Sequence, residues 1–428
     1  MTPGPRRPGE GKRLEARPTR VLLLTQLFQP EPNRLKGLNF ARELVRRGFD
    51  VEVLTGFPSY PGGRIYPGYR LRPWMRETLD GVRITRVPSY PSHDRSALRR
   101  FLSYASFAAA AAVLGPCLVF RPDVVHVYQG PATLAGPAMV FRALFGAATV
   151  LDIQDLWPES VVSAGMLPLP GAAAVLGIWS KLTYRLAKAI VVLSDGYRSC
   201  LLGRGVPSAK IEVVRNWSDE GPVPAEGGPD GPDPHGLRGK FNIVYSGNFG
   251  ALQDLDNVLA AAVLVEAVRS DIRFVFVGGG IEEARLKAAA RERNLYNVLF
   301  IPRQAPEALR AITALSGAML VSLRDDPLAR MGIPQKTQAA LASGKPILMA
   351  VRGSAAELVR EAGAGLVCRP GNPKELAAAA LALAELPIER LRAMGESGRD
   401  FYLRHLSFAI GVERMTSIFA AARPGAEG

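Results

Sequence analysis

The stretch VLLLTQLFQPEPNRLKGLNFARELVRRGFDVEVL, residues 21–54, decides the fold. Its apolar run at 21–28 is too short to span a membrane and ends at a proline, which is typical of a buried parallel strand. A helical pattern follows at 35–47, and Gly48 ends it before a second apolar run at 51–54. Strand, helix and strand in this order predict the start of a doubly wound α/β sheet, in which ligands bind at the carboxyl ends of the strands.

The same alternation of short apolar runs and helix-length stretches continues along the chain. In the first half, further strands are predicted at 82–87, 124–128, 149–153, 189–193 and 211–214. In the second half, they are predicted at 241–245, 274–277, 298–301, 317–322, 346–349 and 365–367. The predicted architecture is therefore α/β, with two Rossmann-like domains that face a central cleft.

Between the two halves lies a stretch rich in Gly and Pro, residues 220–239, in which neither a helix nor a sheet ladder is expected to persist. This linker separates a predicted domain at 19–219 from a second one at 240–400. Residues 1–18 have no apolar stretch, so we expect a flexible basic tail and not a signal peptide. Residues 401–428 are expected to form a C-terminal helix that packs back on the first domain.

The composition describes a globular chain with an uneven charge distribution. The chain has 428 residues and 48% hydrophobic composition, which excludes a disordered or fibrous protein. Three cysteines far apart in sequence indicate neither a disulfide framework nor a metal knuckle and fit a reducing cytoplasm. Residues 1–100 contain 20 Lys/Arg and 9 Asp/Glu, whereas the remaining residues contain 33 and 30. A basic excess confined to one end of the chain can form a surface for phosphates, nucleic acid or anionic lipid.

A mostly apolar segment at 101–120, with arginines on both sides, approaches the length of a membrane span. Ser and Tyr residues interrupt it, and the pair Gly115-Pro116 is expected to break the helix. Three interpretations remain open: a membrane span, a buried helix of the domain, and a helix that lies on the bilayer surface.

Three segments of the second half are candidates for binding a diphosphate. The turns in 245–250 (YSGNFG) and 274–280 (FVFVGGG) follow strands and precede helices, so glycines there let backbone N–H groups approach a phosphate. Tight turns with helix caps are the alternative. Neither segment has a GxGxxG pattern or the acidic residue that holds a ribose, which disfavours an NAD-dependent oxidoreductase. In 332–338 (GIPQKTQ), Lys336 lies in the first turn of a helix, where a cation is unfavourable unless an anion is bound; a solvated lysine is the alternative.

Polar residues of the first half gather where strands run out into loops. The segment 151–160 (LDIQDLWPES) places three carboxylates beside a tryptophan, which suits acceptor binding or general-base work by Asp155, although caps and turns would also explain these residues. His126 is either a core histidine or an acceptor contact. The pair Asp254 and Asp256 lies at a helix start, so we expect capping there and no metal.

Taken together, these residues resemble the GT-B-fold glycosyltransferases of family 4, in particular the bacterial surface-polysaccharide branch described as fucosamine-transferase-like. The resemblance covers residues 20–420. It rests on the order of several short landmarks in the chain: Phe28 to Glu31, Leu54 to Gly63, Asp155 to Ser160, Asn216-Trp217, Tyr245 to Asn248, Pro334 to Lys336 and Gly344 to Pro346.

The resemblance implies a glycosyltransferase that needs no metal and no cofactor, and that works with retention of anomeric configuration. The catalytic residues that it implies are Asp155, Glu159 and Tyr128. The residues that it places around a nucleotide-diphosphate-sugar donor are Gly247, Asn248, Gly250, Gln253, Gly278, Gly279, Arg303 and Lys336. Those on the acceptor side are Glu31, Asn33, His126 and Trp157.

Two features of the family's usual donor site are absent from this sequence. The positions of two glutamates, the second of which holds the ribose, are occupied by Met331 and Ala339. An Arg/Lys pair that grips the diphosphate is also replaced, with Asn248 and Gln253 near those places. We therefore expect Lys336 and backbone N–H groups to hold the diphosphate. A non-catalytic partner subunit and a nucleotide-sugar epimerase remain as alternatives.

The expected function follows from the resemblance and the charge together. We expect transfer of a sugar, most simply from a UDP-linked donor, to a lipid-linked oligosaccharide in bacterial surface polysaccharide synthesis. The basic first half favours an anionic membrane surface over nucleic acid as its partner. The expected location is cytoplasmic, peripheral to the inner face of the plasma membrane.

Overall fold

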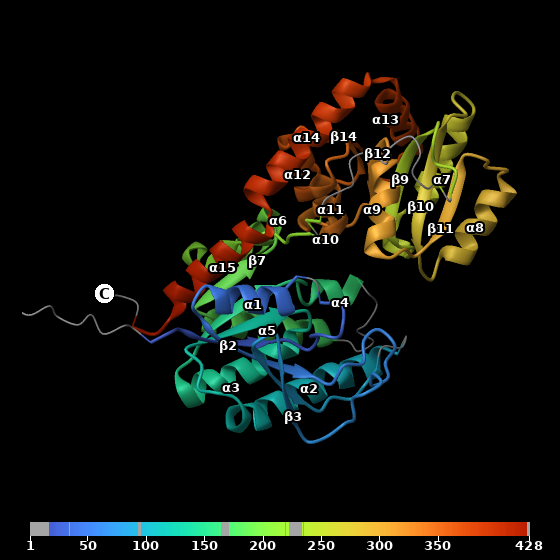
Figure 1. Ribbon diagram of the computed structural model, residues 1–428. Helices are drawn as coiled ribbons and strands as arrows, with labels where there is room; N and C mark the ends of the chain where they lie inside the picture. Colours follow the sequence, from blue (N-terminus) through green and yellow to red (C-terminus); the bar gives the residue numbers. More distant parts are fainter. Residues whose placement is uncertain are drawn as a thin grey trace, which may run out of the picture.

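The chain folds into two α/β domains, one above the other in Figure 1. The computed structural model describes residues 17–33, 35–92, 96–163, 171–218, 220–221, 233 and 235–425. Each domain is built on one sheet, with strand order β3-β4-β2-β1-β5-β6-β7-β8 in the first domain and β11-β10-β9-β12-β13-β14 in the second. In each sheet the first strand of the domain, β1 or β9, lies inside the sheet, so later strands were added on both sides of it. This order confirms the predicted pair of doubly wound domains.

The N-terminal sheet is parallel except for its edge strand β3, which runs antiparallel to β4. Its strands are β1 (Arg20–Leu24), β2 (Asp50–Gly56), β3 (Met75–Leu79), β4 (Val82–Val87), β5 (Val124–Gln129), β6 (Ala148–Ile153), β7 (Ala189–Val192) and β8 (Ile211–Val213). Its helices are α1 (Leu38–Arg46), α2 (Ala97–Leu118), α3 (Ala135–Phe145), α4 (Glu159–Ser163), α5 (Ala172–Leu186) and α6 (Asp195–Gly203). Short 3-10 turns at Ala132–Leu134 and Ser208–Lys210 complete this domain.

The C-terminal sheet is parallel throughout. Its strands are β9 (Phe241–Asn248), β10 (Ile272–Gly279), β11 (Val298–Pro302), β12 (Ala318–Ser322), β13 (Ile347–Ala350) and β14 (Gly365–Cys368). Its helices are α7 (Leu255–Glu266), α8 (Glu283–Glu292), α9 (Pro306–Ala314), α10 (Pro327–Met331), α11 (Gln335–Ser343), α12 (Ser354–Glu361), α13 (Pro373–Glu385) and α14 (Ile388–His405). A 3-10 turn at Ala251–Gln253 follows β9, and α15 (Phe408–Ala422) ends the described chain.

Helices cover both faces of each sheet, because successive side chains of the apolar strands point to opposite faces. In β1, Leu22 and Leu24 belong to the core beneath α2, α3 and α5, whereas Val21 and Leu23 belong to the core beneath α1 and α15. The long helix α2 covers most of the apolar segment at 101–120, which was interpreted as a membrane span, a buried helix or a helix on the bilayer surface. Its inner side packs against the sheet and α3, with Phe107 fully buried.

The structure corrects four details of the sequence-based prediction. The apolar run at 21–28 leaves the sheet after Leu24, and the edge strand β3 was not predicted, since alternating charged residues weaken its apolar signal. Helix α2 continues through Pro116 to Leu118, so the expected break does not occur. Pro116 costs this helix one backbone hydrogen bond, which its missing N–H would otherwise donate to the oxygen of Ala112, and only Cys117 and Leu118 follow it in the helix. Helix α14 crosses the expected domain limit at residue 400 and packs on α11.

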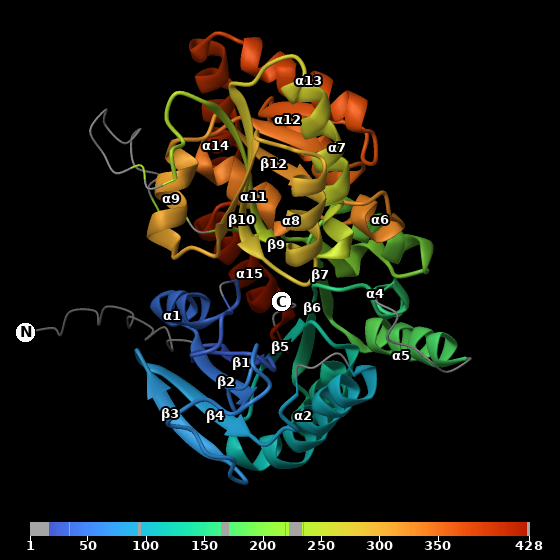
Figure 2. The same cartoon turned by 90° about the vertical axis from the view of Figure 1, so that its right-hand side faces the viewer.

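The last helix of the chain crosses from the second domain to the first. In Figures 1 and 2, α14 lies along the C-terminal domain and α15 continues onto the N-terminal domain. Apolar residues of α15, among them Met415 and Phe419, pack with Phe40 of α1 and with the sheet. Residues 222–232 and 234 of the expected linker lie outside the described residues. Leu237 of the same stretch is buried in the core.

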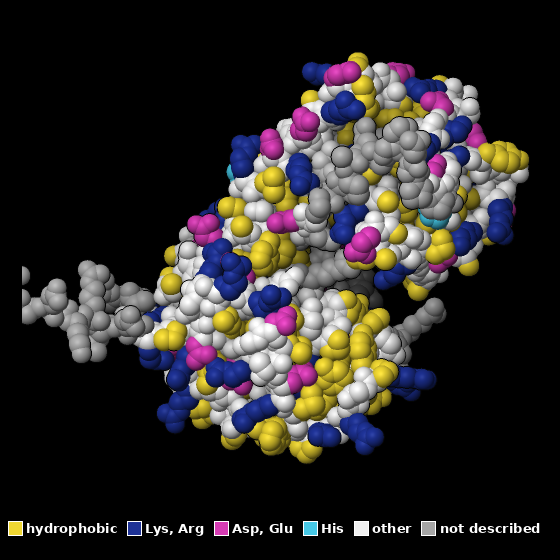
Figure 3. Space-filling model, in the orientation of Figure 1, with side chains coloured by type: hydrophobic (Ala, Val, Ile, Leu, Met, Phe, Trp, Pro, Cys, Tyr) yellow, Lys and Arg dark blue, Asp and Glu magenta, His cyan; other side chains and the backbone are white. Residues whose placement is uncertain are grey.

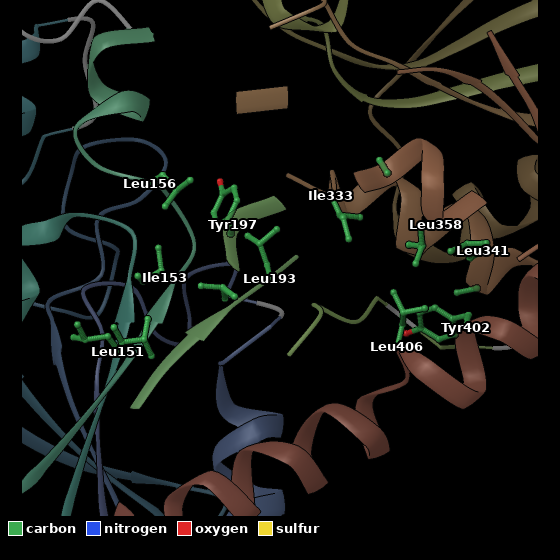
Figure 4. Packing of buried hydrophobic residues seen from close by; sticks show 14 of the residues in the cluster. Leu151, Ile153, Leu156, Leu193, Tyr197, Ile333, Leu341, Leu358, Tyr402 and Leu406 are labelled. Atoms are coloured by element: carbon green, nitrogen blue, oxygen red, sulfur yellow. The ribbon is translucent and has the colours of Figure 1, made fainter. Parts of the chain in front are cut away.

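The two domains share one apolar core. Figure 4 shows Leu193 and Tyr197 of the N-terminal domain and Ile333 of the C-terminal domain in the same cluster. Beside it, the Ser194 hydroxyl donates a hydrogen bond of 2.6 Å to the backbone oxygen of Met331. A Cβ atom at Gly196 would lie 2.5 Å from that oxygen, so the start of α6 approaches α10 as closely as only a glycine permits. These contacts hold the carboxyl ends of the two sheets toward one cleft.

Candidate active site

A cavity of about 510 Å³ lies at the carboxyl edge of the N-terminal sheet. Its walls come from the segments that follow β1, β2, β5 and β6, from the first turns of α2, and from Gln335 at the start of α11 in the other domain. Aromatic, amide and hydroxyl side chains predominate: Gln26, Asn33, Ser59, Tyr60, Ser92, Ser103, Tyr104, Tyr128, Trp157 and Ser160. Such a mixture of stacking surfaces and hydrogen-bonding groups suits a carbohydrate better than an ionic group.

Among the described residues that line this cavity, Asp155 is the one carboxylate. It lies two residues after the end of β6 and is exposed to the open cavity, although nearby protein atoms displace part of the hydration of its carboxylate. This desolvation raises the pKa of Asp155 above its usual value. Its charge in turn contributes to the raised pKa values of Tyr104, Tyr128 and Tyr197. The group can therefore accept a hydrogen bond or a proton from a hydroxyl in the cavity.

Three other residues from the sequence-based site line the same cavity: Asn33, Tyr128 and Trp157. The Trp157 indole N–H donates a 3.0 Å hydrogen bond to the backbone oxygen of Gly130, which fixes the ring. The Asn33 side chain donates to the backbone oxygen of Leu27 at 3.0 Å, so its orientation is also fixed. Tyr128 lies at the carboxyl end of β5, next to β6 in the sheet.

Glu31, His126 and Glu159 do not line the cavity, and for each of them the structure corrects the expected contact with substrate. Glu31 is buried and accepts hydrogen bonds of 2.8 Å from the backbone N–H groups of Ser59 and Tyr60, so it positions the loop that carries these two cavity residues. Glu159 forms an ion pair of 2.6 Å with Arg204.

His126 belongs to a buried polar cluster beneath α1 and α15. Its Nε2 lies 3.2 Å from a carboxylate oxygen of Asp152, and the Lys36 ammonium lies 3.7 Å from the same oxygen. Burial lowers the pKa values of His126 and Lys36, whereas the cation of Lys36 is the main influence that lowers the pKa of Asp152. The interpretation of His126 as a core histidine is the correct one, because His126 lies inside β5 and packs against Phe40 and Phe419. Tyr128, two residues further along the same face, reaches the carboxyl end of the strand and the cavity.

Sequence reasoning missed several cavity residues. Tyr104 and Ser103 lie inside the apolar segment at 101–120, where they were taken only as interruptions of a membrane span. They lie one helical turn before the buried residues Phe107 and Ala108. Polar residues on the apolar side of a helix are the signal that could have identified them. Tyr60 and Gln335 lie in two of the landmark segments, but no local pattern indicated that their side chains line a cavity, because loop geometry and domain arrangement decide where they lie.

On the C-terminal side, two glycine turns pack against each other at the carboxyl ends of β9 and β10. Gly247 and Gly278 have φ angles of 141° and 148°, which glycine adopts readily and other residues rarely do. A Cβ atom at Gly278 would lie 1.9 Å from the backbone oxygen of Gly247, and one at Gly247 would lie 2.6 Å from the Lys336 Cε. These glycines therefore provide room for the lysine side chain at the strand ends.

Lys336, in the first turn of α11, reaches back to the turn after β9. Its ammonium donates a hydrogen bond to the Gln253 side-chain oxygen and lies 4.6 Å from the centroid of the Tyr245 ring. The Tyr245 hydroxyl donates to the same Gln253 oxygen at 3.2 Å. Burial without a carboxylate partner lowers the pKa of Lys336 to about 8. A cation held in this way next to a helix N-terminus is suited to an anionic ligand.

The start of α11 points into the space between the domains. No side chain caps this helix, and the Thr337 N–H donates to the backbone oxygen of Pro334 at 2.8 Å. The N–H groups of Gln335 and Lys336 therefore keep their hydrogen-bonding capacity for other acceptors. Pro334 and Gln335 line a second cavity of about 400 Å³, whose other wall includes Tyr128, Gln154 and Asn216 of the first domain. Gln335, like Leu35 and Tyr128, lines both cavities, so the two cavities adjoin at the start of α11. Lys336 lines neither of them, but it follows Gln335 in the same helical turn.

The remaining donor-side residues occupy the same sheet edge. Asn248 is exposed at the end of β9, and its side-chain oxygen approaches Gly280. Gly250 and Gly279 lie in the two packed turns. Arg303 is exposed and directly follows β11, whose Pro302 pairs with Gly278 in the sheet.

The Asp254 and Asp256 pair does not act as expected. The side chain of Asp254 makes no capping hydrogen bond, and the residue has a left-handed φ of 51°. Asp256 pairs with Arg285 at 2.6 Å. Within the described ranges, no three His, Cys, Asp or Glu side chains form a group that could hold a metal ion.

The fold and this cleft define a two-domain glycosyltransferase of the GT-B class, and the sequence matches agree. Residues 38–217 match the family of glycosyl transferase 4-like domains, and residues 232–401 match the glycosyl transferases group 1. Together these matches cover most of the chain. It therefore belongs to the GT-B glycosyltransferases of family 4, as the sequence landmarks predicted.

Among the relatives, the putative colanic acid biosynthesis glycosyl transferase WcaI of Escherichia coli K12 is 27% identical over 293 residues, which is 65% of this chain and 70% of that protein. The probable glycosyltransferase WbjE of Pseudomonas aeruginosa is 29% identical over 311 residues, 71% of this chain and 75% of that protein. A GDP-mannose-dependent alpha-mannosyltransferase of Mycobacterium tuberculosis is 25% identical over 82% of this chain and 84% of its own.

Solved structures confirm the fold. Sucrose-phosphate synthase from Thermosynechococcus elongatus superimposes with a TM-score of 0.69 at 16% identity, over 94% of this chain and 98% of that one. Anabaena HepE in complex with UDP and glucose superimposes with a TM-score of 0.66 at 14% identity, over 94% of this chain and all of the other.

Proposed function

We propose that this glycosyltransferase moves a sugar from a nucleoside-diphosphate sugar, held by the C-terminal domain, to a lipid-linked saccharide in the synthesis of a bacterial surface polysaccharide. The observation that carries this proposal is that Gln335, at the start of α11, lines the cavity that holds the carboxylate of Asp155. The next residue in that helix is Lys336, whose ammonium is held at the end of β9 by Gln253. The Lys336 side suits a diphosphate and the Asp155 side a saccharide hydroxyl.

The names of relatives support the substrate classes. WcaI is named for colanic acid biosynthesis, and HepE was solved with UDP and glucose. The mycobacterial relative is named as GDP-mannose-dependent. A UDP-linked donor is the first candidate and a GDP-linked donor the second.

The reaction that we propose retains anomeric configuration and uses no metal. As the bond from the anomeric carbon to the diphosphate breaks, the acceptor hydroxyl forms its new bond on the same face, and its proton passes to the departing diphosphate. Lys336 and the free N–H groups of α11 stabilise the negative charge that develops on the diphosphate. Asp155 accepts a hydrogen bond from the acceptor and orients its hydroxyl.

A transfer assay tests this proposal. The purified chain is incubated with UDP-, GDP- and dTDP-sugars and a lipid-linked acceptor, with and without EDTA. Mass spectrometry identifies the product, and NMR determines the configuration of the new bond. We expect a product with the donor's configuration that forms equally well in EDTA. If every donor fails both to react and to raise the melting temperature, the chain is a non-catalytic subunit; conversion of the donor without acceptor would identify an epimerase.

A further inference from the structure

Helix α2 has an outward face that no described part of the chain covers. By length and composition Leu98–Leu118 could cross a membrane, but only 22% of its most apolar window is buried. The exposed apolar residues of α2 are Leu98, Phe101, Leu102, Ala109 and Val113, and the other exposed residues in the described part of the helix are Arg99 and Cys117. A helix of a soluble domain usually turns mostly charged residues toward solvent, so a face on which one arginine stands among five apolar residues indicates a partner.

The same helix cannot be surrounded by lipid, because its other side belongs to the domain. Phe107 and Ala111 are fully buried in the core beneath the sheet. At Gly115 a Cβ atom would lie 2.8 Å from a methyl carbon of Leu54, so the helix also touches the sheet near its C-terminal end. The geometry excludes a membrane span and leaves a helix whose outer half alone can contact an apolar phase.

A second helix on this side of the domain extends the apolar face. Helix α5 exposes Val175, Ile178 and Leu182 along one side. The loop before β3 adds Leu71 and Trp74, and β3 touches α2, since the Arg76 guanidinium donates a hydrogen bond to the backbone oxygen of Leu118. Figure 3 shows a broad yellow area on this domain with dark blue side chains around its edge.

The charge around this face identifies its partner. No Asp or Glu occurs in 57–74, 97–122 or 171–186, although these segments carry eight Lys or Arg residues. In the described part of the chain, Arg64, Arg70 and Arg72 form no ion pair, whereas Arg42 and Arg83 of the same domain pair with Asp80 and Asp50. An apolar face surrounded by unneutralised arginines and a tryptophan complements the headgroup region of an anionic bilayer.

We propose that the outward faces of α2 and α5, with the loop 64–74, dock the enzyme on an anionic lipid surface. This inference rests on the proposed function, because a lipid-linked acceptor is the reason for the enzyme to dock on a lipid surface. The turn of α2 that exposes Phe101 and Leu102 also directs Ser103 and Tyr104 into the cavity of Asp155. The docking residues and the cavity residues therefore lie in the same turn of α2. A saccharide can enter the cavity there while its lipid anchor stays in the bilayer.

Vesicle sedimentation tests the docking face without any catalytic step. The full chain is mixed with phosphatidylcholine vesicles that contain 0 or roughly 30% phosphatidylglycerol, an anionic fraction that gives a negative surface potential. We expect binding only to the anionic vesicles, and less of it at high salt. The double variant Arg70→Gln/Arg72→Gln should weaken binding about 30-fold, because each cation near an anionic surface contributes about a fivefold gain. Phe101→Ser/Leu102→Ser should weaken it at least about tenfold.

Matched variants on the other domain serve as controls. Val268→Ser/Ile281→Ser removes two apolar side chains that are more exposed than Phe101 and Leu102, and Arg360→Gln/Arg390→Gln removes two exposed arginines. Both should bind vesicles like the wild type. Equal vesicle binding by all variants would overturn the docking face. The proposal would also be overturned if Phe101→Ser/Leu102→Ser changed the protein from a dimer to a monomer without loss of vesicle binding. The face would then be a contact between protein subunits. Vesicle binding together with failed transfer would refute the proposed function but not this face.

Discussion

At the scale of single residues, Lys336 carries most of the argument for the donor site. The family's two glutamates are replaced by Met331 and Ala339, and Met331 instead gives its backbone oxygen to Ser194 across the domain interface. Lys336 is held by Gln253 and Tyr245 in a position that a neutral pocket would not favour. Because burial lowers the pKa of Lys336, its ammonium is stabilised when a negatively charged ligand binds beside it.

The first prediction concerns the pH dependence of donor binding. The pKa of Lys336 is lowered to about 8, so the ammonium is fully present below that pH and is lost as the pH rises through it. Affinity for UDP should therefore fall about tenfold between pH 7 and pH 9. Calorimetric titration at several pH values measures this. In Lys336→Met the affinity should be low and independent of pH in this range; a wild-type slope in that variant would contradict the assignment.

The second prediction concerns Asp155. Desolvation raises its pKa, so the ionised form that accepts a hydrogen bond is lost as the pH falls through a value above the usual range of Asp. The acid limb of the kcat profile should lie correspondingly high. Asp155→Asn should lower kcat about 100-fold and abolish that limb. Glu159→Gln is the control, because that carboxylate pairs with Arg204 outside the cavity and should leave the limb unchanged.

At the scale of elements, a buried ion pair joins segments that are far apart in sequence. Lys36, between β1 and α1, reaches Asp152 of β6, and both side chains are 2% exposed. The Lys36 ammonium also lies 3.9 Å from the centroid of the Trp217 ring, which α15 covers through Phe408 and Gly411. The cluster therefore connects the sheet, α1 and the crossing helix α15.

The third prediction follows from this pair. Lys36→Met leaves the carboxylate of Asp152 buried without its cation, which should cost about 3–5 kcal/mol in the free energy of unfolding. Urea denaturation measures the loss. The double variant Lys36→Met/Asp152→Asn should recover part of it, because neither charge is then buried alone. Equal destabilisation by the single and double variants would show that the pair does not act as a unit.

At the scale of the whole molecule, the sequence was sufficient for the architecture but not for the cleft. Apolar periodicity located nearly every strand, since parallel strands are apolar on both faces. The antiparallel strand β3 was missed, because its alternating charges resemble a loop. Asp155, Trp157 and Lys336 were found from strand ends and a helix start, whereas Gln335 and Tyr60 were not. Their places depend on how two domains and a loop pack, which no local pattern contains.

The central claim is that one side of the cleft holds the donor and the other holds the acceptor. Steady-state kinetics with each substrate varied in turn, in Lys336→Met and Asp155→Asn, test it most directly. Lys336→Met should raise KM for the nucleotide sugar and leave KM for the acceptor unchanged. Asp155→Asn should leave the donor KM unchanged, while kcat and the kcat/KM for the acceptor fall. If both substitutions affected the donor alone, or neither affected transfer, the assignment of the two sides would be wrong.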